Sequence, residues 1–202
     1  MAAALGRTAL TAAGWAGGGR KTSRSSDRRL PRWGAMDAAF TLAWQHAAGQ
    51  VFPEDLPMAA AELLAAGDDS PALCDLAGRS RGEPTGELEE LFREAMAELG
   101  VPVPDEALAG RCLLRHLAAG VAEGRLAPKE ATGTAWHGMD EFATEVERRF
   151  ARAAKRLCCA DCLVVVEDGD PEAFRAWEQE VSAAADAVAV ATDDPRGWTR
   201  RR

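Results

Sequence analysis

Three cysteines within five residues, Cys158, Cys159 and Cys162, form the most chemically suggestive cluster of this sequence. A Cys-x-x-Cys pair can exchange disulfides, or it can hold zinc, which usually takes four ligands. The chain has no second Cys-x-x-Cys pair. A zinc site built on these three thiolates would therefore need a fourth ligand from elsewhere in the sequence. The candidates for that ligand are Cys112, His116 and His137.

The position of this cysteine cluster favours a structural role over either chemistry. A redox pair works best at the N-terminus of a helix, where the helix dipole lowers the thiol pKa. Here the cysteines follow Leu157, which the apolar periodicity places at a helix C-terminus. Cysteine also packs well as a small hydrophobe. We therefore expect at least one of Cys158 and Cys159 to pack inward and expect no cofactor, with zinc as the alternative.

Two other groupings approach known motifs without matching them. His137, Asp140 and Glu141 lie in a predicted turn, where they could bind a metal or act as acid and base. They lack the His-Glu-x-x-His spacing, so a packed histidine is the better interpretation. Residues 14–22 resemble a phosphate loop, but Arg20 separates the glycines from Lys21 and no strand leads in. We therefore assign no catalytic or cofactor-binding residue.

Glutamates recur along the helix that the sequence predicts over residues 85–100. Spacings of three and four residues place Glu87, Glu90, Glu94 and Glu98 on one helical face. Such a face can be merely solvated, or it can dock onto a basic partner. These four residues are our candidate interaction residues.

The elements that position all these residues are predicted to be helices. About eight segments between residues 37 and 190 combine an N-cap or proline start, an apolar stripe of period 3.6 and, in most, a glycine stop. The predicted N-caps include Asp37, Ser70, Thr85, Asp105, Asp140 and Asp170. Residues 162–166 form a short apolar run that could be one strand or a buried connector. The sequence thus predicts an all-α, bundle-like domain with short connections.

One core should hold the large apolar residues of these stripes. The residues that we expect to find there are Leu91, Phe92, Leu117, Val146, Phe150 and Trp177.

A change of charge at Met36 divides the chain. Residues 1–35 carry seven basic groups and one acid, for a charge of +6, whereas the whole chain carries −8, which leaves −14 on residues 36–202. The first stretch lacks any helical or strand period and is expected to be a disordered basic arm. It could be a start-site artefact, a basic tail or a transit peptide. The helical domain is expected over residues 36–190 and a flexible tail over residues 191–202.

Composition also limits the surroundings and partners. The five cysteines are an odd number without a secretory segment before them, which indicates a reducing cytoplasm. No apolar run approaches the ~20 residues of a membrane helix. The acidic balance argues against nucleic-acid binding by the folded domain and favours a partner protein with a basic surface.

Two segments resemble parts of small acidic helical proteins from high-GC bacteria. They run from Asp69 to Gly78 and from Gly124 to Ala131, with Glu98-Leu99-Gly100 between them. The resemblance covers about residues 55–137. The group has no assigned activity, so the resemblance implies no site residues here.

The function that the sequence favours is that of a non-enzymatic, acidic, helical protein-binding module of the antitoxin or immunity kind. The alternative is a metal- or redox-responsive regulator that uses the three cysteines. An enzyme that works from the turn at His137–Glu141 is a third hypothesis. Partner identity and oligomeric state stay open.

Overall fold

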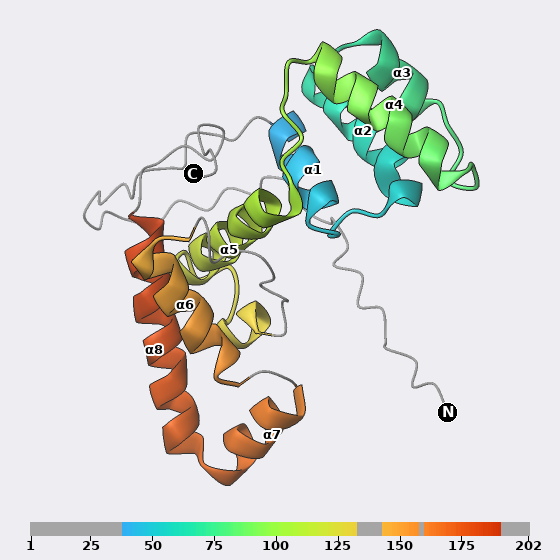
Figure 1. Ribbon diagram of the computed structural model, residues 1–202. Helices are drawn as coiled ribbons and strands as arrows, with labels where there is room; N and C mark the ends of the chain where they lie inside the picture. The colour runs from blue at the N-terminus through green and yellow to red at the C-terminus, as the bar shows by residue number, and fades with distance from the viewer. Residues whose placement is uncertain (1–37, 133–142, 158–159, 191–202) are drawn as a thin grey trace, which may run out of the picture.

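The computed structural model describes residues 38–132, 143–157 and 160–190, and it confirms the all-α prediction (Figure 1). Over these ranges the chain forms eight α-helices and two 3-10 turns and contains no strand. The α-helices are α1 (Ala38–Ala47), α2 (Leu56–Ala66), α3 (Pro71–Ala77), α4 (Thr85–Glu98), α5 (Glu106–Ala122), α6 (Glu145–Lys155), α7 (Ala160–Gly169) and α8 (Pro171–Ala189). The 3-10 turns are η1 (Pro53–Asp55) and η2 (Pro128–Ala131). None of the described helices combines the length and apolar character that a membrane span requires.

The helices pack as two groups that α1 joins (Figure 1). Helices α2, α3 and α4 pack against one another, and α5, α6 and α8 form the second group, with α7 against α8. Helix α1 reaches both, because its His46 ring lies 4.9 Å from the Phe92 ring of α4 and its Trp44 ring lies 5.6 Å from that of His116 in α5. One cluster of buried apolar side chains draws on both groups.

Three of the six predicted N-caps are confirmed by local hydrogen bonds. Ser70, Asp105 and Asp170 each accept a bond of 2.9 to 3.2 Å from the backbone N–H three residues ahead, as N-caps do. Gly67 ends α2 with φ of +104°, a conformation that only glycine adopts without strain. Thr85 was predicted to cap α4, but it is the first helical residue, and Pro84 precedes it without a side-chain bond.

The predicted core is confirmed at three of six positions, and two more lie at its margin. Phe92, Phe150 and Trp177 are buried in the shared cluster, and Leu91 and Leu117 pack partly buried against it. The prediction for Val146 was wrong, because 37% of this residue is exposed.

Helix α6 differs from the prediction in both its start and its inward face. It begins at Glu145 behind the N-cap Thr144, whereas we expected a helix starting at Asp140, which lies outside the described residues. The side chain that turns inward beside Phe150 is Glu147, which is fully buried. Two buried arginines of α5 bind this carboxylate. The face of α6 that turns inward therefore contains a charge and is not the purely apolar face that we expected.

The prediction of a strand or a buried connector at residues 162–166 was wrong, because this run is helical, as part of α7, and 69% of Val165 is exposed. Helix α7 packs against α8, and Lys129 of η2 lies 3.9 Å from Glu167 near the end of α7. All described neighbours are helices and offer no strand edge. A helix satisfies the backbone hydrogen bonds of this segment internally, which a lone strand could not do.

Candidate interaction surface on helix α4

Helix α4 has one face in the core and an acidic face directed outward. Its buried residues, Leu88, Phe92, Ala95 and Met96, pack within the α2–α4 group. Glu87, Glu90 and Glu94 are exposed. At 100° per residue these three carboxylates fall within an arc of about 60°, well away from the buried stripe, and we call them the acidic strip. Glu98 is exposed as well and lies about 20° from Glu87 around the helix, so all four predicted interaction residues share one accessible face.

The three carboxylates of the strip have no cationic partner in the part of the chain that the structure describes. The Arg79 guanidinium pairs with the carboxylates of Asp75, at 3.0 Å, and of Glu83, at 3.3 Å. Neither of these acids is in the strip. Residues 53–100, which span η1 to the end of α4, hold twelve acids and three arginines, for a net charge of −9. The strip thus belongs to a strongly negative lobe, residues 53–100.

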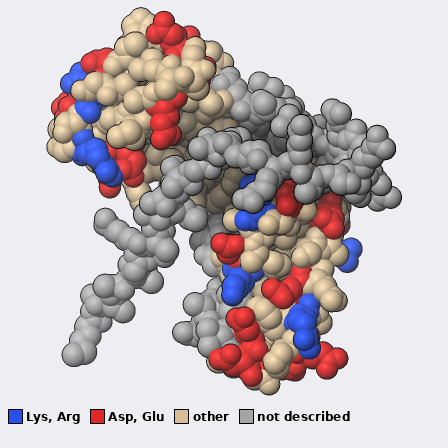
Figure 2. Space-filling model, turned by 180° about the vertical axis from the view of Figure 1, so that it is seen from behind, with Lys and Arg blue, Asp and Glu red and all other residues tan. Residues whose placement is uncertain are grey.

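The second group of helices has a different electrostatic character. Residues 106–190 hold fifteen acids and ten basic residues, and several pairs meet on the surface. On α6, for example, Glu145 lies 3.2 Å from Arg148 and 2.7 Å from Arg152. Figure 2 shows the contrast from behind: red and blue side chains mix over the lower half, whereas the upper half shows blue only along one edge.

Glu98, the fourth predicted residue, differs from the other three because it also makes a structural hydrogen bond. Its Oε2 accepts a 2.9 Å hydrogen bond from the backbone N–H of Ala72, at the start of α3. Pro71 has no N–H, and Ser70 already accepts from Leu73, so Glu98 satisfies the remaining donor of that turn. Sequence reasoning missed this role, because the two residues are 26 positions apart.

A buried ion cluster between α5 and α6 was also missed. Arg111 Nε lies 3.0 Å from both carboxylate oxygens of Glu147, and Arg115 donates to the same carboxylate. All three side chains are buried. The Thr144 backbone N–H donates to Glu147 Oε2 at 2.6 Å, which completes a capping box at the start of α6.

This cluster keeps Glu147 ionised. Burial by itself would raise the pKa of the carboxyl group, but the bonds from the Thr144 backbone and from the guanidinium groups of Arg115 and Arg111 outweigh it, so the pKa lies below the ordinary value. Two signals in the sequence pointed to the cluster: two arginines four residues apart within an apolar stripe, and the spacing Thr144-x-x-Glu147. The cluster fixes α5 against α6 and is remote in sequence from the acidic strip.

The structure tests the cysteine cluster only in part. Cys158 and Cys159 lie outside the described residues, so the three-cysteine ligand set stays a prediction. Cys162 lies in the first turn of α7 and is partly buried. For this residue, the expected position at a helix C-terminus was wrong, because a new helix starts at Ala160 and places Cys162 near a helix N-terminus.

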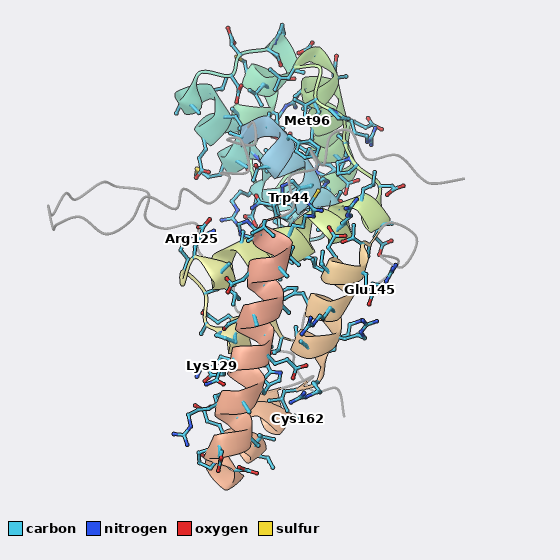
Figure 3. All side chains as sticks on the ribbon, turned by 90° about the vertical axis from the view of Figure 1, so that its left-hand side faces the viewer. Trp44, Met96, Arg125, Lys129, Glu145 and Cys162 are labelled. Atoms are coloured by element: carbon cyan, nitrogen blue, oxygen red, sulfur yellow. The ribbon has the colours of Figure 1, made fainter. Side chains whose placement is uncertain are left out.

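The other candidate ligands do not form a site within the described residues. The Cys112 thiol is in the core, where burial raises its pKa to about 12. The His116 ring lies beside Trp44, in the middle of the molecule, whereas Cys162 is near the far end (Figure 3). No group of three His, Cys, Asp or Glu side chains in residues 38–132, 143–157 and 160–190 could hold a metal ion.

Two groupings cannot be placed. His137, Asp140 and Glu141 lie outside the described ranges, as do residues 14–22.

Comparison of this chain with protein-family models, curated proteins and solved structures finds no match.

Proposed function

We propose that this chain is a non-enzymatic binding protein whose α2–α4 group docks onto a basic surface of a partner protein, as antitoxin and immunity proteins mask their targets. The observation that carries the proposal is the strip of Glu87, Glu90 and Glu94, which is exposed and has no counter-charge among the described residues. The strip lies on helix α4, whose other side is buried in the core.

Charge complementarity explains what such a strip would contribute. Opposite potentials steer encounter and select partners more than they add affinity. An exposed ion pair is worth about 0.2–1 kcal/mol, so three pairs contribute at most about 3 kcal/mol, or roughly a hundredfold in affinity. Binding through this strip should therefore weaken steeply with salt.

The test is affinity capture with the tagged full chain from extracts of the source cells, followed by mass spectrometry. The test variant carries E87Q, E90Q and E94Q. The matched control carries D168N, E172Q and D186N, three exposed acids of α7 and α8 with the same change in total charge. We expect the wild type and the control variant to capture a protein with a basic surface. The test variant should fail to capture it.

Purified proteins then give the decisive measurement, a dissociation constant at low and high salt. A partner that binds the E87Q/E90Q/E94Q variant as tightly as the wild type would refute the proposal. So would a partner whose contact surface is acidic.

A second candidate, a redox-responsive regulator, is favoured by the start of α7 at Ala160. This start places Cys162, the second cysteine of Cys159-x-x-Cys162, in the first turn of a helix, where the dipole stabilises a thiolate. We expect a Cys159–Cys162 disulfide in glutathione buffers, detected by mass spectrometry after alkylation and absent from C162S. Zinc in protein purified without chelator, lost in C162S, would favour the metal-binding form of this hypothesis instead.

A further inference from the structure

Helix α2 is apolar on nearly all sides, and yet one side of it faces solvent. Glu62 is its only charged residue, and no other side chain in Leu56–Ala66 is polar. A helix that is apolar all round is normally buried. On α2, however, 64% of Met58 is exposed, and Ala65 and Ala66 are exposed with it.

A second large apolar side chain lies at the same end of this helix. Phe52 precedes η1, which runs directly into α2, and it is 56% exposed. The Asp55 backbone N–H donates to the Phe52 carbonyl at 2.9 Å, so a hydrogen bond closes the turn that follows Phe52. From Phe52 to Met58 the backbone rises by only about 10 Å along the helical axis. Leu56 and Pro57, between them, are buried and hold this segment in place.

Acidic groups border this apolar face. Glu54 is in η1 and Glu62 is one turn beyond Met58, whereas Asp55 is bound by Arg81. The turn η1 also packs against α4, the helix that carries the acidic strip. The apolar residues are therefore set in the same negative lobe, and a complementary surface would present an apolar strip with basic margins.

We propose that Phe52 and Met58 are the apolar anchors of the partner interface, and that they receive one exposed amphipathic helix whose apolar strip is bordered by lysine or arginine. The inference rests on the proposed function and specifies its partner. Docking of amphipathic helices on apolar surfaces is a recurring recognition mode, in which aromatic residues and methionine adapt to the incoming side chains. A second copy of this chain is the poorer occupant, because it would bring its own Glu62 and its own negative lobe into the contact.

The test uses synthetic peptides as probes, so it does not depend on identifying the natural partner. The first probe is a fluorescein-labelled, ~18-residue amphipathic helix of leucine and lysine, long enough to be helical when bound. The second has the same lysines with serine for every leucine. Binding to the full chain is measured by fluorescence anisotropy, with the wild type, Met58→Asp, Phe52→Asp and the E87Q/E90Q/E94Q variant. Val165→Asp is the matched control, because Val165 is 69% exposed on the remote helix α7.

We expect the leucine peptide to bind the wild type and Val165→Asp equally. Binding should fall at least about tenfold with Met58→Asp, with Phe52→Asp and with the serine peptide. Circular dichroism confirms that each variant keeps its fold.

Three outcomes would overturn the inference, and they separate its failure from that of the proposed function. If both peptides bind equally and only the E87Q/E90Q/E94Q variant binds them more weakly, the charged strip is supported and the role of Phe52 and Met58 is refuted. If neither peptide binds, both proposals fall. If sedimentation shows a dimer that Met58→Asp abolishes, the face belongs to a second copy of the chain.

Discussion

Replacing Glu147 with glutamine should destabilise this protein far more than the same change at Glu145, two residues away. Both glutamates are on α6 and both bind two arginines. The difference is burial: Glu147 and its partners Arg111 and Arg115 are 0 to 5% exposed, whereas Glu145 is exposed. The pair of variants therefore compares the same chemistry in two dielectric environments.

The magnitude follows from what glutamine can still do. Its side-chain carbonyl can accept the Thr144 backbone bond, so the helix cap survives and the charge alone is removed. Removing one partner of a buried ion pair costs about 3–5 kcal/mol, because the charge of the other partner stays buried without an opposite charge beside it. Solvent screens the two exposed pairs of Glu145, so Glu145→Gln should cost far less than Glu147→Gln. For a chain of this size, the loss at Glu147 corresponds to a fall in Tm of roughly 6–20 °C.

The assay is urea unfolding followed by circular dichroism, which gives the free energy of unfolding for the wild type and both variants. Equal losses in the two variants, or a loss below about 1 kcal/mol for Glu147→Gln, would refute this reasoning. If the free energy of unfolding falls with urea concentration at the same slope in all three proteins, the variants differ in stability and not in the surface exposed on unfolding.

Four further predictions follow from single contacts. Because the pKa of Glu147 is lower in the folded state, its contribution is present above the unfolded glutamate pKa of about 4.3 and is lost as pH falls through the folded pKa; acid titration should therefore destabilise the wild type more than Glu147→Gln. Glu98→Ala should cost about 0.5–2 kcal/mol in urea unfolding, through loss of the bond to Ala72 N–H, whereas Glu94→Ala should cost under about 0.5 kcal/mol. Gly86→Ala, with nothing within 4 Å of its new Cβ, should raise the unfolding free energy by about 0.5–1 kcal/mol, but Gly120→Ala should lower it, because its Cβ would lie 2.6 Å from Leu126 Cδ1 and 2.9 Å from Cγ. Cys112, whose pKa burial raises to about 12, should resist iodoacetamide until the protein unfolds, whereas the exposed Cys74 reacts in the native state; mass spectrometry of the labelled peptides checks this.

The candidate surface was largely predictable from the sequence, because its residues belong to one helix. The spacing of Glu87, Glu90 and Glu94 sets their common face as soon as residues 85–98 are helical. Glu98 fits the same spacing, but it contacts α3, and only the packing of α3 against α4 reveals that. The sequence also could not show that Phe52 and Met58 are exposed, because their exposure depends on which sides of α2 the neighbouring helices cover.

By itself, the sequence determined the features of this protein that are set within a few residues: the helical class, the caps Ser70, Asp105 and Asp170, and the glycine end of α2. These depend on hydrogen bonds and backbone angles that each segment satisfies alone. Tertiary structure decided the inward face of α6. Val146 is the more apolar choice, but Glu147 turns inward because Arg111 and Arg115, 36 and 32 residues earlier, meet it there. A buried charge is stable only beside its partner, and a partner on another helix cannot be read from local periodicity.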